Sequence, residues 1–257
     1  MRNMTVAQSA WRDTGVGVLD RAVAVLDAVE QGARTFTAIV DATGYSRTTV
    51  HRLVKSLVEH ELIDLRGGSG YRLGPRLLRF ANRAMHDLPL RDIAHPFLER
   101  LVAMTGESAQ LYVRSATERV CIDAMESERE LRTIVGVGAT LPLTAGSAGK
   151  VFLAFDEIGP AADRMIDDAV AWTPSTPLGE DLRRQLIQIR RRGWASSAGE
   201  RQAGVGSVSA PIFGPDGELL AALSVSGPET RLGRIAAKRL APAIVATARE
   251  IGAALTA

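Results

Sequence analysis

The chain has 257 residues, of which 46% are hydrophobic and 23% charged, and a formal net charge of +2. This composition excludes an intrinsically disordered chain, and the length suggests two domains. The single cysteine, Cys121, excludes an internal disulfide, and no apolar run approaches the roughly 18 residues that a membrane span requires. We therefore expect a cytoplasmic protein that does not bind membranes. Residues 1–15 lack the apolar stretch of a signal peptide and are expected to form a disordered tail.

Residues 38–57 are the most informative segment, because they predict two helices joined by a tight turn at Gly44. Ser46 is a suitable N-cap for the second helix, expected over residues 46–60. The face opposite its apolar stripe carries donors and hydroxyls and no carboxylate before Glu59, which suits phosphates and base edges in a major groove. The pattern predicts a helix-turn-helix, and the alternative is a solvated helical hairpin. The residues expected to face DNA are Ser46, Arg47, Thr48, Thr49, His51, Arg52 and Lys55.

A hairpin is predicted directly after this helix. Two short alternating segments, 62–66 and 71–73, flank the glycine-rich turn 67–70, as in a wing whose Arg66 and Arg72 reach the DNA. With the preceding amphipathic helix, these elements predict a winged helix-turn-helix domain over residues 16–74. Eight Arg or Lys residues and three acids lie between residues 46 and 83, whereas residues 89–257 contain 19 basic and 20 acidic residues. Positive charge concentrated in one segment is typical of nucleic-acid binding.

Residues 75–88 predict a linker helix with an apolar stripe, which could pack on its own domain or on a second chain. Because helix-turn-helix proteins commonly bind paired half-sites, we expect a homodimer or a dimer of dimers. Residues 89–257 predict an α+β domain in which helices flank an antiparallel sheet. The expected strands cover 108–114, 119–125, 131–137, 194–198, 207–213 and 218–226, and residues 230–255 are expected to form one closing helix.

Residues 145–150, Ala-Gly-Ser-Ala-Gly-Lys, resemble a P-loop and a nucleophile elbow and satisfy neither pattern. The small residues at this expected helix start could present backbone N–H groups to a carboxylate, or could only permit close packing of the helix. Ser224 and Ser226 alternate with apolar residues, so both hydroxyls face the same side of a strand. The four histidines lack metal-ligand spacing, and we expect neither a metal site nor a cofactor.

Four segments in order, 42–57, 71–78, 141–155 and 199–232, resemble the IclR family of bacterial transcriptional regulators. The resemblance implies an N-terminal winged helix-turn-helix, a linker helix and a C-terminal effector domain with a GAF-like or profilin-like fold. It further implies dimers or tetramers that repress or activate catabolic operons in response to small metabolites, often carboxylates. Carried over from the family, the effector-binding residues are Ser147, Ala148, Ser197, Ser207, Ser224 and Ser226. Ser197 stands where the family can have an acidic ligand contact, and Ser207 replaces an apolar residue or cysteine.

The sequence therefore predicts a regulator that binds operator DNA and a small organic-acid effector, without catalysis. One alternative is a serine hydrolase that uses Ser147 as the nucleophile, but no histidine follows residue 95 to serve as its base. Another is an architectural DNA-binding protein whose second domain only oligomerises. A ligand-dependent change in operator affinity would distinguish a regulator from this last class.

Overall fold

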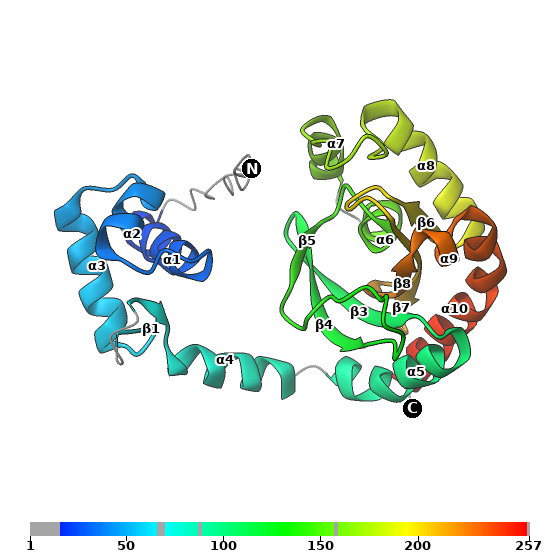
Figure 1. Cartoon of the computed structure of the whole chain (residues 1–257), viewed down its shortest axis with the longest axis horizontal. Coiled ribbons are helices and arrows are strands. Elements are labelled where there is room, and N and C mark those ends of the chain that lie inside the picture. The colour runs from blue at the N-terminus through cyan, green and yellow to red at the C-terminus, as the bar shows by residue number, and fades with distance from the viewer. Residues whose placement is uncertain (1–15, 66–69, 87–88, 157–158, 256–257) are drawn as a thin grey trace. The chain divides into compact units, whose positions relative to one another are not determined.

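The computed structural model describes residues 16–65, 70–86, 89–156 and 159–255 (Figure 1). The chain divides into two compact units, Met1–Asp87 and Leu88–Ala257. The expected disordered tail over residues 1–15 and the wing residue Arg66 lie outside the described residues. Within the described part of the chain, every helix is too short or too polar to cross a membrane.

The first unit contains the predicted helix-turn-helix and a short hairpin. Its elements are α1 (Gly17–Glu30), α2 (Phe36–Thr43), α3 (Arg47–Glu59), β1 (Ile63–Asp64), β2 (Arg72–Leu73) and α4 (Pro75–His86). Gly44 ends α2 in the left-handed conformation at φ 68°, and the Ser46 hydroxyl accepts a hydrogen bond from the Thr49 amide at 3.2 Å. The predicted turn and N-cap are therefore confirmed. Seven buried side chains form the core of this unit: Val25, Val29, Ile39, Val50, Val54, Leu57 and Ile63.

The second unit is built on a six-stranded antiparallel sheet with the strand order β5-β4-β3-β8-β7-β6. The strands are β3 (Ser108–Ser115), β4 (Glu118–Met125), β5 (Thr140–Pro142), β6 (Ala195–Ala198), β7 (Val205–Phe213) and β8 (Leu219–Pro228). The helices are α5 (Pro89–Thr105), α6 (Ser147–Phe155), α7 (Pro160–Asp167), α8 (Gly179–Arg192), α9 (Glu229–Leu232) and α10 (Arg234–Ala254). The predicted α+β class with an antiparallel sheet is confirmed.

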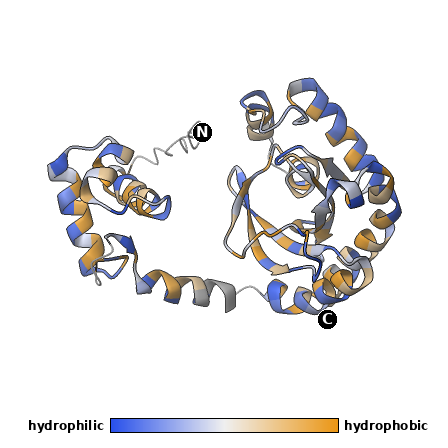
Figure 2. Ribbon diagram, in the orientation of Figure 1, coloured by the Kyte–Doolittle hydropathy of each residue, from blue (hydrophilic) through white to orange (hydrophobic). Residues whose placement is uncertain are grey.

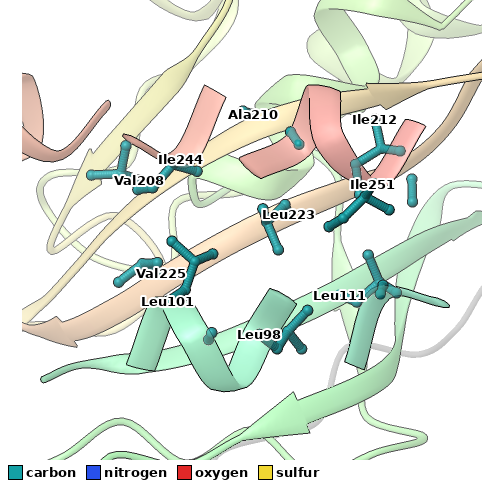
Figure 3. Close-up of a cluster of buried hydrophobic side chains, with 14 of the residues drawn as sticks. Leu98, Leu101, Leu111, Val208, Ala210, Ile212, Leu223, Val225, Ile244 and Ile251 are labelled. Carbon is teal, nitrogen blue, oxygen red and sulfur yellow. The ribbon is translucent and has the colours of Figure 1, made fainter. Parts of the chain in front are cut away.

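The two faces of this sheet bury different kinds of side chain. Helices α5 and α10 cover one face, whose core includes Leu101, Val208, Leu223 and Ile244 (Figures 1 and 3). Helix α6 covers the other face and packs in turn against α8. Because side chains alternate along a strand, the apolar residues 223 and 225 of β8 face α5 and α10, and residues 224 and 226 face α6. The covered face beneath α6 is therefore where buried polar groups gather.

Two predicted elements of the second unit are wrong. Residues 131–137 form no strand, and the segment runs as a loop in which Leu131 and Ile134 are exposed while Thr133 and Val135 are buried. Strand β5 and the preceding residues 138 and 139 bond to this edge of β4, so the alternating pattern of residues 131–137 reflects a loop with one buried side and not a paired strand. The closing helix is also interrupted, because Gly233 adopts an extended conformation between α9 and α10.

Candidate functional site

The outer face of α3 carries the residues that the sequence predicts to face DNA. Six of the seven are exposed, namely Ser46, Arg47, Thr48, His51, Arg52 and Lys55. The opposite face supplies Val50, Val54 and Leu57 to the core, and Figure 2 shows hydrophilic and hydrophobic residues alternating along the helix. The surface combines cations with short hydroxyls, a combination that can contact phosphates and base edges.

Local contacts orient several of these side chains. The Arg47 guanidinium lies 5.1 Å from the centre of the Phe36 ring, and the His51 ring meets the same ring edge-on at 6.4 Å. Thr49 is half-buried, and its hydroxyl lies 2.9 Å from that of Ser46, so it belongs to the helix cap as well as to the surface. In the wing, the Arg72 guanidinium of β2 forms an ion pair with the Asp64 carboxylate of β1 at 3.0 Å.

A polar patch lies beneath α6 because the strand register aligns short polar residues. One row across four strands joins Ser197 of β6, Ser207 of β7, Ser226 of β8 and Ser108 of β3. The next polar row joins Ser209, Ser224 and Gln110. Residues paired side by side on one face have Cβ atoms about 5 Å apart, so hydroxyls in these rows lie within reach of one another.

Four serines of these rows, Ser197, Ser207, Ser224 and Ser226, line a small cavity of about 30 Å³. All six effector residues proposed from the sequence line it, namely Ser147, Ala148, Ser197, Ser207, Ser224 and Ser226. The Ser147 hydroxyl lies 2.6 Å from that of Ser209, which donates to Ser224 at 2.9 Å. The Ser226 hydroxyl donates to the Gln110 side chain at 3.0 Å. The structure thus gathers residues from α6, β6, β7 and β8 around one space.

A buried ion pair lies behind the cavity. The Lys150 ammonium, on a side chain that is 1% exposed, donates to Glu200 Oε1 at 2.5 Å and to the Ser196 carbonyl at 2.7 Å. The other Glu200 oxygen accepts from the Gly146 amide at 3.1 Å, at the start of α6. Burial lowers the pKa of Lys150, an effect that the neighbouring Glu200 opposes. This pair fixes the first turn of α6 to the segment between β6 and β7.

Arg119 of β4 is the second buried cation of this region, and the sequence analysis did not single it out. Its side chain is 3% exposed, and it donates to the carbonyls of Pro142 and Ala145. Burial lowers its pKa to about 10. Its guanidinium lies 5.4 Å from the centre of the Tyr112 ring, and both residues line the cavity.

The α6 glycines of the Ala-Gly-Ser-Ala-Gly-Lys segment have a steric role. A Cβ atom on Gly149 would lie 2.3 Å from the Leu143 carbonyl oxygen and 2.6 Å from a terminal nitrogen of Arg119. A Cβ atom on Gly146, which has a φ of +88°, would lie 3.0 Å from the same guanidinium. Close packing, which the sequence analysis left open as one alternative, therefore accounts for both glycines.

The hydrolase alternative finds no support in this geometry. The described residues that line the cavity include no histidine, and the hydroxyl of Ser147 is engaged with Ser207 and Ser209. Lys150 could not serve as its base, because the ammonium is bound to Glu200 and to two other oxygens. Among the residues that the structure describes, no group of three His, Cys, Asp or Glu side chains could hold a metal ion.

The comparison with known families decides the identity of the fold. A profile described as Bacterial transcriptional regulator IclR C-terminal matches residues 82–253, and one described as IclR helix-turn-helix domain matches residues 18–66. The chain belongs to the IclR family. It is therefore a DNA-binding transcriptional regulator, and neither matching domain belongs to an enzyme family.

Individual IclR-family relatives extend over nearly the whole chain. The regulator BhcR of Paracoccus denitrificans is 30% identical over 92% of this chain and 86% of its own length. A regulator from a Silicibacter species has a solved structure with a TM-score of 0.80 and 27% identity, covering 93% of this chain and 95% of that one. An IclR homologue from Microbacterium hydrocarbonoxydans, solved in complex with 4-hydroxybenzoate, has a TM-score of 0.76 and 27% identity, covering 93% and 99%.

Sequence reasoning missed the cavity residues of this IclR-family regulator that lie on β3 and β4, and those that follow β6. These residues include Tyr112, Arg119 and Arg201, whereas Gln110, which accepts from Ser226, and Glu200 lie outside the lining. The charged residues among them resemble ordinary surface residues in the sequence. The available signal was the alternation in β3, where Gln110 and Tyr112 fall opposite the apolar residues 109 and 111.

Proposed function

We propose that this IclR-family regulator changes its affinity for operator DNA when a small organic acid binds in the cavity beneath α6, and that it thereby controls a catabolic operon. The observation that carries the proposal is the convergence of the six residues Ser147, Ala148, Ser197, Ser207, Ser224 and Ser226 on one space. Hydroxyls can donate to a carboxylate and accept from a hydroxyl, so the patch suits a polar ligand. The Microbacterium homologue that binds 4-hydroxybenzoate supports the same ligand class.

The small volume of the cavity supports a change in the shape of the second unit when a ligand binds. About 30 Å³ corresponds to roughly two water molecules, so an organic acid requires the covering segments to move. Those segments are the loop that contains Thr133 and Val135 and the turn that contains Arg201 and Gln202. A ligand that binds the opened form more tightly than the closed form shifts the population between them, which regulation requires.

For DNA, we propose that the exposed α3 residues and Arg72 contact the duplex, with Arg52 and Lys55 as the main cationic contacts. Both lie near the middle of the helix on the face opposite Val50 and Val54. A helix that enters the major groove presents such a face to the bases, and its flanking cations bind phosphate.

We further propose a homodimer, or a dimer of dimers, in which α4 contributes contacts. Leu78 and Phe80 on this helix have exposed fractions of 73% and 54%, and the Arg76 guanidinium lies over the Phe80 ring. Sedimentation at micromolar concentration should show an oligomer. Replacing Leu77 and Phe80 by charged residues should weaken assembly before it unfolds the second unit. A monomeric wild-type chain would contradict this proposal.

The ligand proposal is tested with a double variant, Ser224→Val and Ser226→Val, against Ser115→Val as a control at an exposed serine outside the cavity. Calorimetry with a panel of catabolic acids first identifies a ligand, and its effect on operator affinity is then measured. We expect the double variant to bind that ligand at least tenfold more weakly, while the control binds it normally. Equal affinity of the wild type and the double variant would rule out this cavity as the effector site.

A further inference from the structure

Arg119 is a buried cation without an acidic partner. Its side chain is 3% exposed, and it donates hydrogen bonds to two backbone carbonyls, those of Pro142 and Ala145. The Nε atom is buried and has no hydrogen-bond partner among the described residues. No ion pair within the described part of the chain includes this guanidinium. A buried charge that only neutral dipoles compensate is costly, so an anion nearby would stabilise it.

Other buried charges in the same unit do have ionic partners. Glu107, also 3% exposed, binds Arg129 at 2.8 Å and Arg231 at 2.5 Å. Lys150 binds Glu200. The fold therefore supplies counter-charges where a buried charge serves structure alone, and Arg119 differs from them in lining a cavity.

The charged residues of the cavity wall also favour a bound anion. Among the described residues that line it, the charged ones are Arg119 and the half-buried Arg201, and both are cationic. Glu200, whose negative charge acts on Arg119, already binds Lys150 and the Gly146 amide. That occupied amide also removes one of the N–H groups at the start of α6 that could otherwise receive a ligand carboxylate.

The position of Arg119 is fixed before any ligand binds. The Tyr112 ring lies against its guanidinium, and the absence of side chains at Gly146 and Gly149 leaves the space that it occupies. A guanidinium held in place loses little freedom on binding, and its planar donors match the two oxygens of a carboxylate.

We propose that Arg119 is the residue that binds the carboxylate of the effector and that it makes the cavity selective for acids over neutral analogues. The serine hydroxyls then receive the remaining polar group of the ligand, and Arg201 adds a weaker, partly solvated attraction. This inference rests on the proposed function, because it names the ligand class of the same cavity.

The experiment uses the full-length protein and three acids, acetate, benzoate and 4-hydroxybenzoate, each paired with its neutral amide. Calorimetry and thermal shifts compare the wild type with Arg119→Met, Arg119→Gln and Arg119→Lys. Arg114→Met is the matched control, because Arg114 pairs with Asp156 outside the cavity lining. Circular dichroism and gel filtration establish that each variant is folded, and Arg119→Gln retains donors in case Arg119→Met does not fold.

We expect at least one acid to bind the wild type tenfold more tightly than its amide. Loss of the charge at residue 119 should weaken acid binding at least tenfold and leave amide binding unchanged, Arg119→Lys should be intermediate, and Arg114→Met should bind normally. Equal acid binding by a folded Arg119→Gln variant, equal binding of acid and amide, or no response to any acid would each overturn the inference. The Ser224 and Ser226 double variant separates failure of this inference from failure of the proposed function. If an acid binds the folded Arg119→Gln variant as tightly as the wild type but binds the double variant weakly, the cavity is the ligand site and only the role of Arg119 is wrong. If the double variant also binds the acid normally, the proposed function fails as well.

Discussion

The recognition surface of α3 and the cavity beneath α6 present positive charge in opposite ways. Arg52 and Lys55 are exposed, and the Lys55 ammonium lies 3.9 Å from the Glu59 carboxylate in a solvent-exposed ion pair. In the second unit, Arg119 and Lys150 are 3% and 1% exposed and are held by several fixed acceptors. Exposed cations keep their hydration and adapt to a long polyanion, whereas buried cations require partners in fixed positions.

This difference has a consequence for selectivity. Many weak phosphate contacts depend strongly on salt concentration and carry little information about sequence, so selectivity on DNA depends on the few side chains that reach bases. A buried guanidinium is screened far less by salt and can select one small anion. The two surfaces should therefore respond differently to substitution, salt and pH.

The largest effect is expected from breaking the buried pair of the second unit. Lys150→Met leaves the Glu200 carboxylate buried without its cation, which should lower the free energy of unfolding by about 3–5 kcal/mol. Combining it with Glu200→Gln should recover at least half of that loss, because the remaining amide still accepts from Gly146. Urea unfolding of the two single variants and the double variant measures the coupling. Additive losses would show that the pair is not energetically coupled.

A smaller effect is expected on the exposed surface. If Arg52 reads a base, Arg52→Ala should weaken operator binding by about 1–3 kcal/mol and relax the preference at one position. If it binds phosphate, the loss should be similar for all sequences and the salt slope should fall by about one. The operator is obtained by selecting random DNA with the full-length protein, and Arg249→Ala on α10 is the control. Unchanged affinity and salt slope would remove Arg52 from the interface.

Alkaline pH should lower the stability of the second unit through Cys121, which is buried in the core beneath α6. Burial raises the pKa of the Cys121 thiol from 9.0 to about 12, so above pH 9 the unfolded chain releases a proton that the folded chain retains. This contribution to stability is complete below pH 9 and is lost as pH rises toward 12, at up to ~1.4 kcal/mol per unit. The stability difference between the wild type and Cys121→Ala should therefore shrink by about 1 kcal/mol between pH 8 and pH 10. A difference independent of pH would contradict this assignment.

The smallest effect is expected at the exposed pair of α3. Lys55 and Glu59 are 69% and 64% exposed, and pairs of this kind contribute about 0.3–0.5 kcal/mol. Glu59→Gln should change the free energy of unfolding by no more than this, and the change should vanish in high salt. A loss comparable to that of Lys150→Met would remove the contrast between the two regions.

Local patterns in the sequence predicted much of the fold and part of the candidate site. The Ser46 cap, the Gly44 turn and the apolar stripe of α3 involve residues within one or two helical turns, so spacing alone predicted them. Ser224 and Ser226 were placed on one side of a strand because alternation follows from strand geometry. Residues 131–137 show the limit of the same rule, since their alternation belongs to a loop with one buried side and not to a strand.

The sequence by itself determined the two-part organisation expected here, the capped recognition helix and the family, because these depend on short-range periodicity and ordered motifs. Only the tertiary structure decided which charges are buried. The Arg119 side chain lies against Gly149 because β4 pairs with β5, and α6 follows β5 closely in the chain. Lys150 binds Glu200, which lies 50 residues further along the sequence. Burial depends on long-range packing and strand register, which residue spacing does not encode. That physical difference explains why the sequence indicated the serines of the cavity and did not reveal its cations.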